Sequence, residues 1–304
     1  MKLAVIDLGT NTCNLLIAEI DGKTYRLLYQ GKEGVKLGKG GIGKNLLTNE
    51  AFQRATAALQ KHQQTIRRYQ AEKVVTIATS AVRDAANQNE FAAHLMQRTG
   101  LELTVISGEE EARLIFEGVK LAVGNLPDDT LILDIGGGSN ELIQTKNNAV
   151  LWKESFPLGM ARVVEQFPIS DPITTAEVAT IEAYFEKGLA NLWTQLNGTS
   201  ISGLIGCSGA FDTLADLIDQ TPPGTKQRIA QHIQMSDFEA VSSQIMSSTK
   251  AQREKMTGME PLRVEMIVPS FILIRLLRKK LKISEITQTD FALREGVLYE
   301  WINH

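Results

Sequence analysis

The sequence predicts an α/β protein built from a duplicated unit, and two observations lead to this prediction. Short apolar runs of strand length alternate with longer segments of helical period along the 304-residue chain, as in layered α/β folds. Residues 3–29 and 131–154 also share one pattern: an apolar run that ends in Asp-(Leu/Ile)-Gly, a turn rich in small polar residues, and two further apolar runs. We therefore expect two related α/β units.

Each copy of the repeat predicts a three-stranded antiparallel meander. Asp21-Gly22 separates two apolar runs in the first copy, and Asp-Gly between such runs is a strong hairpin signal. Residues 146–148 form the corresponding polar turn in the second copy. Asp7 and Asp134 end the first strand of each copy. Two unrelated strand-turn-strand units are the alternative, but the matched Asp, Gly and hydroxyl positions favour a duplication.

Periodicity predicts the remaining elements in chain order. We expect helices at 49–69, 88–99, 108–122, 174–193 and 290–301, and a further helix after the turn at residues 207–210. We expect strands at 73–78, 103–106 and 203–206.

Two predicted capping boxes mark helix starts. These are Ser107-Gly-Glu-Glu110 and Thr174-Thr-Ala-Glu177, where a hydroxyl and a glutamate three residues later satisfy free backbone N–H groups. In the first of these helices, Glu109 lies four residues before Arg113, which is the spacing of a surface ion pair.

Composition excludes several classes of function. Thirty-two basic against 35 acidic residues give a net charge of −3, so we expect no nucleic-acid partner. Cys13 and Cys207 have no metal-type spacing, and their small number favours a reducing, cytoplasmic setting. The N-terminal apolar run ends at Asp7, unlike a signal peptide, and the longest apolar run, 266–277, is interrupted and too short to span a membrane.

The two repeat turns carry residues suited to phosphate. Phosphate oxygens need backbone N–H donors at close range, glycine permits that approach, and hydroxyl groups add donors. An aspartate at the strand end can hold Mg²⁺ directly or through water. The sequence therefore predicts two phosphate loops that face each other, with Asp7 and Asp134 as metal residues. The loop residues are Gly9, Thr10, Asn11 and Thr12 in the first copy, and Gly136, Gly137, Gly138 and Ser139 in the second.

Glu111 is the candidate general base. In the predicted helix it shares a face with Leu114, Ile115 and Gly118, which is the apolar side. A glutamate on a buried face is unusual and needs a reason. Burial raises the pKa of a carboxylate, which suits a base that takes a proton from water beside a phosphate.

Residues 38–45, GKGGIGKN, approach the P-loop pattern G-x-x-x-x-G-K-[ST] but end in Asn45. Asn45 cannot supply the hydroxyl that binds Mg²⁺, and no strand-helix unit surrounds the segment. We predict instead a mobile glycine-rich surface loop with Lys36, Lys39 and Lys44. It either guides an anionic chain at the mouth of a cleft or is simply solvated.

Together, these motifs resemble those of the exopolyphosphatase/guanosine pentaphosphatase (Ppx/GppA) family, within the actin–Hsp70–sugar kinase superfamily. The Glu-Glu-Ala-Arg-Leu-Ile and Leu-Arg-Glu-Gly blocks separate this family from actins and sugar kinases. The segments that carry the resemblance are 7–12, 79–85, 106–115, 133–142, 206–210 and 292–299.

The resemblance implies a fold and an activity. The fold is two actin-like (ribonuclease H-like) domains, 1–123 and 124–287, around a central phosphate-binding cleft, with residues 288–304 packing back on the first domain. The activity is Mg²⁺-dependent hydrolysis of terminal phosphoanhydrides in polyphosphate or in pppGpp, and guanosine penta- or tetraphosphate is an implied ligand. A homodimer is implied by family analogy.

The resemblance also assigns residues. Glu111 matches the family's catalytic glutamate, Asp7 and Asp134 match its metal-linked aspartates, and Glu141 matches a second acidic residue of the site. Arg83 matches an arginine that reaches the phosphates, and Arg263 is a looser match to a basic residue of the phosphate channel.

The turn containing Ser208 and Gly209 matches a third phosphate or nucleotide loop. Two departures stand out: Asn140 replaces the usual Thr, and Cys207-Ser-Gly-Ala210 replaces the common Ala-Ser-Gly-Thr.

Two other functions remain open from sequence. An ATP-dependent kinase or ATPase of the same superfamily would share both loops, although no motif for an acceptor site with an Asp base is found. A non-catalytic sensor of pppGpp or polyphosphate would not need Glu111 or the two aspartates.

Overall fold

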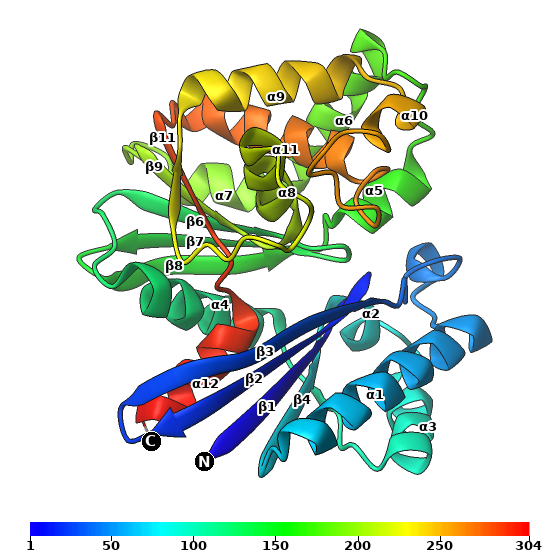
Figure 1. Ribbon diagram of the computed structural model, residues 1–304. Helices are drawn as coiled ribbons and strands as arrows, with labels where there is room; N and C mark the ends of the chain where they lie inside the picture. Colours follow the sequence, from blue (N-terminus) through cyan, green and yellow to red (C-terminus); the bar gives the residue numbers. More distant parts are fainter. Residues whose placement is uncertain (304) are drawn as a thin grey trace.

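The computed structural model describes residues 1–303 and contains two mixed sheets, one above the other in Figure 1. In each sheet an antiparallel meander continues into parallel strands, so the predicted duplication is confirmed. The first sheet has the order β3 (Thr24–Gly34), β2 (Thr12–Asp21), β1 (Lys2–Leu8), β4 (Lys73–Ala78) and β5 (Thr104–Val105). The second has the order β8 (Ala149–Phe156), β7 (Asn140–Lys146), β6 (Thr130–Ile135), β9 (Gly203–Cys207), β11 (Glu285–Thr289) and β10 (Gln231–Ile233).

The two meanders share one register. Asp7 pairs with Asn14 across β1 and β2, and Asp134 pairs with Glu141 across β6 and β7. Each aspartate is therefore the partner of the residue seven positions later (14 − 7 and 141 − 134). The chemistry of the two copies differs at this second position, where the first has an amide and the second a carboxylic acid.

Helices cover both faces of each sheet. Those associated with residues 1–123 are η1 (Ile42–Lys44), α1 (Asn49–Tyr69), α2 (Ser80–Arg83), α3 (Gln88–Thr99) and α4 (Gly108–Val123). The remaining helices are α5 (Met160–Gln166), α6 (Thr175–Gly188), α7 (Ala190–Gln195), α8 (Gly209–Asp219), α9 (Met235–Ser247), α10 (Lys250–Arg253), α11 (Ile267–Leu281) and α12 (Leu293–Asn303).

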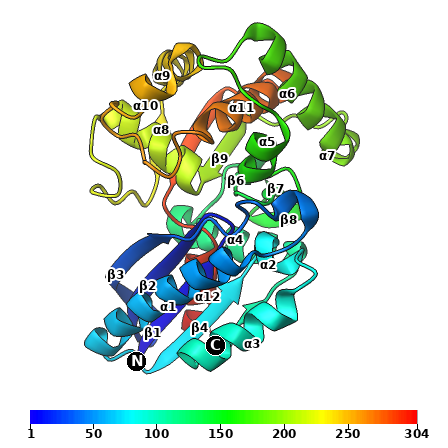
Figure 2. The same ribbon diagram turned by 90° about the vertical axis from the view of Figure 1, so that its right-hand side faces the viewer.

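Alternate side chains of β1 enter two different cores. Ala4 and Ile6 pack with α1 and α3, which lie together on one face of the first sheet (Figure 2). Leu3 and Val5 point to the other face and pack with α4 and α12. A strand buried on both faces is nearly continuous in apolar residues, as the sequence of β1 is.

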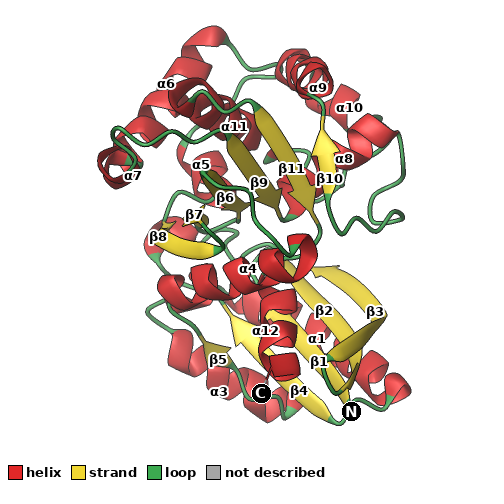
Figure 3. Ribbon diagram, turned by 90° about the vertical axis from the view of Figure 1, so that its left-hand side faces the viewer, coloured by secondary structure: helices red, strands yellow, loops and turns green. Residues whose placement is uncertain are grey.

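Helices α4 and α12 form a layer between the two sheets (Figure 3). Ile132 and Ile143 of the second sheet belong to the same buried cluster as Leu3 and Val5 of the first. This shared cluster joins the two halves of the molecule, so the first turn of α4 lies close to both sheets.

Glycines allow α4 and α12 to approach closely. A Cβ atom at Gly118 would lie 2.0 Å from the carbonyl oxygen of Ala292, and one at Gly296 would lie 1.9 Å from that of Leu114. These contacts are to backbone, which cannot rotate away, so only glycine fits at either position.

Several predicted elements match and others need correction. The bounds expected for α1, β4 and α3 are those observed. The helix expected to run through Trp193 instead breaks after Gly188, since Leu189 leaves the helical conformation. The last helix begins at Leu293 rather than Asp290, because the amide of Ala292 is bound by the Glu295 carboxylate at 2.9 Å.

The first predicted capping box is half formed. Ser107 accepts the Glu110 amide at 3.1 Å, but the Glu110 carboxylate binds Arg113 instead of returning to the cap. The expected pairing of Glu109 with Arg113 is therefore wrong, and the other partner of Arg113 is Glu300 on α12. The second predicted box, at Thr174 and Glu177, is complete.

No helix within residues 1–303 combines the length and the apolar character needed to cross a bilayer. The domain limits at 123 and 287 stay a prediction, and His304, part of the predicted terminal segment, lies outside the described residues.

We expect Gly296→Ala to destabilise the protein by about 3 kcal/mol, near the upper end of overpacking costs, because the new methyl group would meet the Leu114 backbone. Urea unfolding monitored by circular dichroism measures this. Gly203→Ala is the matched control, since its nearest neighbour is the Thr130 hydroxyl at 3.3 Å, and it should cost less than about 1 kcal/mol. Equal stabilities of the two variants would contradict the close-packed crossing.

Candidate functional site

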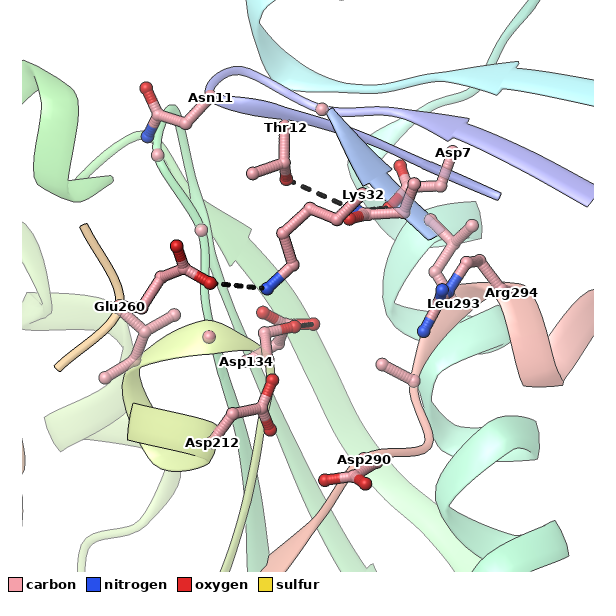
Figure 4. A pocket seen from close by; sticks show the side chains of 18 of the residues that line it. Asp7, Asn11, Thr12, Lys32, Asp134, Asp212, Glu260, Asp290, Leu293 and Arg294 are labelled. Atoms are coloured by element: carbon pink, nitrogen blue, oxygen red, sulfur yellow. Dashed lines mark hydrogen bonds and ion pairs between the residues drawn. The ribbon is translucent and has the colours of Figure 1, made fainter. Parts of the chain in front are cut away.

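A cavity of about 440 Å³ lies between the two sheets (Figure 4). Asp7 and Thr12 lie on the side of the first sheet, and Asp134 and Asp212 lie on the side of the second. Within residues 1–303, Arg83 is the one predicted site residue that does not line the cavity. The predicted residues that do are Asp7, Gly9, Thr10, Asn11, Thr12, Glu111, Asp134, Gly136, Gly137, Gly138, Ser139, Glu141, Ser208, Gly209 and Arg263.

The two predicted phosphate loops form the same turn and touch each other. Gly9 N donates to Thr12 O at 2.9 Å, and Gly136 N donates to Ser139 O at 3.0 Å. A Cβ atom at Gly137 would lie 2.1 Å from Asn11 Nδ2. The loops therefore face one another as expected, and glycine is needed for this approach.

The start of α5 fixes the carbonyl groups of the second loop. Amides of residues 159–161 donate to the carbonyls of residues 136–138 at 2.8–3.3 Å. In a planar trans peptide the N–H group points opposite to the C=O group. The N–H groups of residues 137–139 are thereby turned away from α5, where an anion could accept from them.

The segment directly after β3, which leads into GKGGIGKN, does the same for the first loop. Leu37 N donates to Thr10 O at 2.7 Å, while the amides of residues 35–36 donate to Asn11 O at 2.9 and 3.1 Å. Leu37 and Ile42 are buried, so the prediction of a mobile surface loop is wrong for this part of the segment.

None of residues 36–45 is among the described residues that line the cavity, which removes the support for a guiding role at the cleft mouth. Residues 35–38 bind the carbonyl groups of the first predicted phosphate loop from behind instead.

Glu111 lies in the first turn of α4 and is 8% exposed, as the helical-face argument predicted. Arg83 Nη1 donates to its Oε2 at 2.8 Å and to the carbonyl of Ile106 at 3.2 Å. Burial raises the pKa of Glu111 to about 7, although the Arg83 charge acts to lower it. A carboxylate with a pKa near neutrality can accept a proton and release it under physiological conditions.

Two further carboxylates of the same cavity are Asp134, which is buried, and Asp7, which is partly buried. Burial raises the pKa of Asp134 to about 7, despite a 2.7 Å hydrogen bond from Ser208 Oγ. Burial also raises the pKa of Asp7, which accepts from Asn14 Nδ2 at 3.1 Å. Ser208 adopts φ 68°, a strained value for a non-glycine residue, in the turn that brings its hydroxyl to Asp134.

Glu141 is the most deeply buried acid of the group, at 1% exposure. It accepts from Ser155 Oγ at 2.6 Å. Burial raises its pKa well above the usual range, and the nearby charges of Glu111 and Asp134 raise it further. Asn14 takes the same register position in the first meander, so the second copy has an acid where the first has a neutral amide.

The carboxylates of Asp7 and Asp134 suit a magnesium ion that is also bound by water and substrate, rather than a metal held by protein ligands alone. Asp7 and Asp134 offer oxygen ligands from opposite sheets, and their negative charges are poorly compensated. No cluster of three or more His, Cys, Asp or Glu suited to a metal occurs in the described part of the chain. Mg²⁺ commonly binds one or two carboxylates together with water and substrate phosphate, so this donor set suits it.

Arg263 is a buried cation with no ion-pair partner within residues 1–303. It is 7% exposed, lies against Gly209, and no described residue accepts a hydrogen bond from its Nη1. A buried charge without a partner is costly, and an anionic ligand would supply one.

The cavity is also lined by residues that the sequence prediction missed, among them Asp212, Asp290, Lys32 and Glu260. Gln288 Nε2 bridges the carboxylates of Asp212 and Asp290 at 3.0 and 2.7 Å. Lys32 and Glu260 form a 3.3 Å ion pair between strand β3 and the segment before α11 (Figure 4). Asp290 follows β11, which runs parallel to β9, and ligands commonly lie at the carboxyl ends of such strands. That rule was the available signal for Asp290.

The Ppx/GppA phosphatase family model matches residues 16–304. Among curated proteins, exopolyphosphatase 2 of Mycobacterium tuberculosis is 28% identical over 322 residues, covering 97% of each chain. Exopolyphosphatase 1 of Mycobacterium bovis is 27% identical over 310 residues, covering 98% of this chain and 87% of that protein.

Solved structures agree with the fold. An exopolyphosphatase from Cytophaga hutchinsonii is 35% identical, with a TM-score of 0.94 over 100% of this chain and 98% of that one. The Aquifex aeolicus member of the Ppx/GppA family is 22% identical, with a TM-score of 0.81 and coverages of 100% and 98%. The predicted pair of actin-like α/β domains is therefore confirmed.

We expect Glu141→Gln to stabilise the magnesium-free protein increasingly as pH rises. The folded-state pKa of Glu141 is raised, so the wild type loses stability as pH increases from about 4.5 toward that pKa, and Gln removes this loss. The gain between pH 5 and pH 8 should be at least about 1.4 kcal/mol, the value of one pKa unit. Urea unfolding in EDTA at each pH measures it.

Glu110→Gln is the control for this series. Arg113 lowers the pKa of Glu110, so any stability that this pair contributes is complete above pH 4.5 and is lost only at lower pH. Its effect should be the same at pH 6 and pH 8. A stability difference for Glu141→Gln that does not change with pH would contradict the raised pKa.

Proposed function

The chain belongs to the Ppx/GppA phosphatase family, and from this premise we propose that it is a hydrolase that releases terminal phosphate from inorganic polyphosphate. Exopolyphosphatases are among its relatives over nearly the whole chain. The observation that carries the proposal is Glu111, a buried carboxylate with its pKa raised to about 7, in a cavity lined by two phosphate loops. Hydrolysis of pppGpp, which ends in the same kind of phosphoanhydride, is part of the proposal.

The loops provide the binding energy. Amides of residues 137–139, turned away from α5, donate to the terminal phosphate from one side, and residues 9–12 approach it from the other. Arg263 supplies a positive charge from within the second half of the molecule. Donors fixed in place before the substrate binds stabilise the charge that develops in the transition state without further reorganisation.

Glu111 acts on the attacking water. As a carboxylate it accepts a proton from a water aligned with the terminal phosphorus, while the Arg83 contact holds its side chain. The oxygen of that water forms the new bond to phosphorus as the bond to the bridging oxygen breaks, and the remaining chain leaves shortened by one phosphate. Binding alone requires no such base, which favours an enzyme over a sensor.

We propose that Mg²⁺ is the cofactor and that Asp7 and Asp134 hold it. When bound, Mg²⁺ neutralises negative charge on the phosphate oxygens. The raised pKa values of the two aspartates support this proposal, because a nearby cation would favour their ionised forms.

The Glu111→Gln variant should lose about 10²–10⁴-fold in the rate of phosphate release, the usual contribution of a general base. The assay compares long polyphosphate, short polyphosphate and pppGpp as substrates in the presence of Mg²⁺. Glu109→Gln, an exchange in the same helical turn, should keep near-normal rates. Near-normal release by Glu111→Gln would rule out this base, and ATP consumption that depends on an added acceptor would favour the kinase alternative.

Magnesium should raise the unfolding free energy of the wild type. Above its dissociation constant, each tenfold increase in Mg²⁺ should add about 1.4 kcal/mol, as for any ligand that binds only the folded state. Asp134→Asn should weaken this dependence strongly, whereas Asp237→Asn, an exposed position on α9, should keep it. Chemical denaturation across a magnesium series gives the slopes, and equal slopes for both variants would refute the proposed ligand.

A further inference from the structure

Arg162, on α5, connects three segments from the two halves of the molecule. Its Nε donates to the carbonyl of Gly138 at 2.8 Å, and its Nη2 contacts Asp84 Oδ2 at 2.6 Å. Its Nη1 donates to the carbonyl of Ile42 at 3.4 Å. The side chain is 16% exposed and thus largely desolvated. One guanidinium therefore joins the second phosphate loop to α2 and to η1, which lie with the first sheet.

Asp84 continues this connection toward the proposed base. It follows Arg83 directly and accepts from Ser80 Oγ at 3.2 Å. Arg83 Nε lies 3.8 Å from Asp84 Oδ1, and the other end of the same guanidinium binds Glu111. A continuous series of polar contacts thus joins the two halves of the molecule. It runs from the Gly138 carbonyl through Arg162, Asp84 and Arg83 to Glu111.

Ser80 marks how close the two sides are here. A Cβ atom at Gly138 would lie 2.5 Å from Ser80 Oγ, so the second phosphate loop rests against the helix that precedes Asp84. Arg162 donates hydrogen bonds on both sides of this contact, to Gly138 on one side and to Asp84 on the other. A planar guanidinium can hold several acceptors in fixed directions, which a flexible ammonium group cannot.

We propose that Arg162 is a positioning residue for the hydrolytic reaction, and this inference rests on the proposed function. It sets the second phosphate loop at a fixed distance from the Arg83–Glu111 pair. The loop holds the phosphate and Glu111 holds the water, and they belong to opposite sides of the cleft. Their separation therefore depends on a contact that crosses it, and a displacement of about 1 Å between reacting groups can cost about 10²-fold in rate.

The kinetic test uses Arg162→Met, Asp84→Asn and the double variant, with short polyphosphate as substrate. We expect Arg162→Met to lower kcat by about 10–100-fold with less than about threefold change in KM, because the loops still bind phosphate. The double variant should be no slower than the slower single variant, since both remove one connection. Multiplied effects, or a loss confined to KM, would overturn the proposal.

Arg278→Met is the matched control. It removes an ion pair with Glu239 that lies between α9 and α11, away from the cleft, and should leave kcat unchanged. If Arg162→Met does not fold, Arg162→Lys replaces it, and a kcat equal to that of the wild type would then refute the role.

Hydrogen exchange of the ligand-free proteins separates this proposal from the proposed function. Loss of Arg162 should speed amide exchange in residues 136–142 and 80–84, whichever substrate the enzyme uses, and Arg278→Met should not. Unchanged exchange at both segments would overturn the inference, even if the wild type hydrolyses polyphosphate. Faster exchange in Arg162→Met at both segments, combined with no phosphate release by the wild type, would instead refute the proposed function alone.

Discussion

Both phosphate loops depend on the same constraint, which is the capture of their carbonyl groups by the segment that follows the third strand of each meander. In the first copy that segment is residues 35–38, and in the second it is residues 159–161. Backbone amides cannot be aimed at a ligand individually, because each N–H is tied to the neighbouring C=O through a planar peptide. Fixing the carbonyls from behind therefore fixes the donors in front. The duplication has preserved this arrangement, although residues 35–38 lie outside any helix or strand and residues 159–161 begin α5.

The acidic residues of the cavity are shielded from solvent, and this shielding raises their pKa values. Asp7, Glu111, Asp134 and Glu141 are all enclosed between the sheets, and burial raises the pKa of each. Cations compensate these acids only in part: Arg83 contacts Glu111, Arg294 acts to lower the pKa of Asp7, and Arg263 Nη1 has no hydrogen-bond partner within residues 1–303. This imbalance costs stability in the absence of ligand, as is common where a site is prepared for chemistry. A divalent cation and a polyanion would satisfy both sets of charges together.

Local sequence patterns predicted much of the fold and part of the candidate site. The bounds of α1, β4 and α3 followed from periodicity and flanking turns, and the repeat pattern located the two equivalent turns at residues 9–12 and 136–139. The helical-face argument placed Glu111 correctly because helix geometry alone decides which residues share a face. Arg162 and Asp84 were missed because they are 78 positions apart and meet only through the tertiary fold. Residues 36–38, predicted to be part of a mobile surface loop, were misjudged because their contribution is made by backbone amides, which do not show in the sequence pattern.

The close crossing of α4 with the last helix has a consequence for how the chain is made. The face of α4 that carries Leu114 and Gly118 is covered by α12, whose residues are 293–303. During synthesis the first sheet and α4 leave the ribosome long before that cover exists, and domains usually fold in the order in which they emerge. The apolar face of α4 therefore stays uncovered until residues 293–303 have been translated. Chaperone binding to nascent chains is expected to concentrate on this interval.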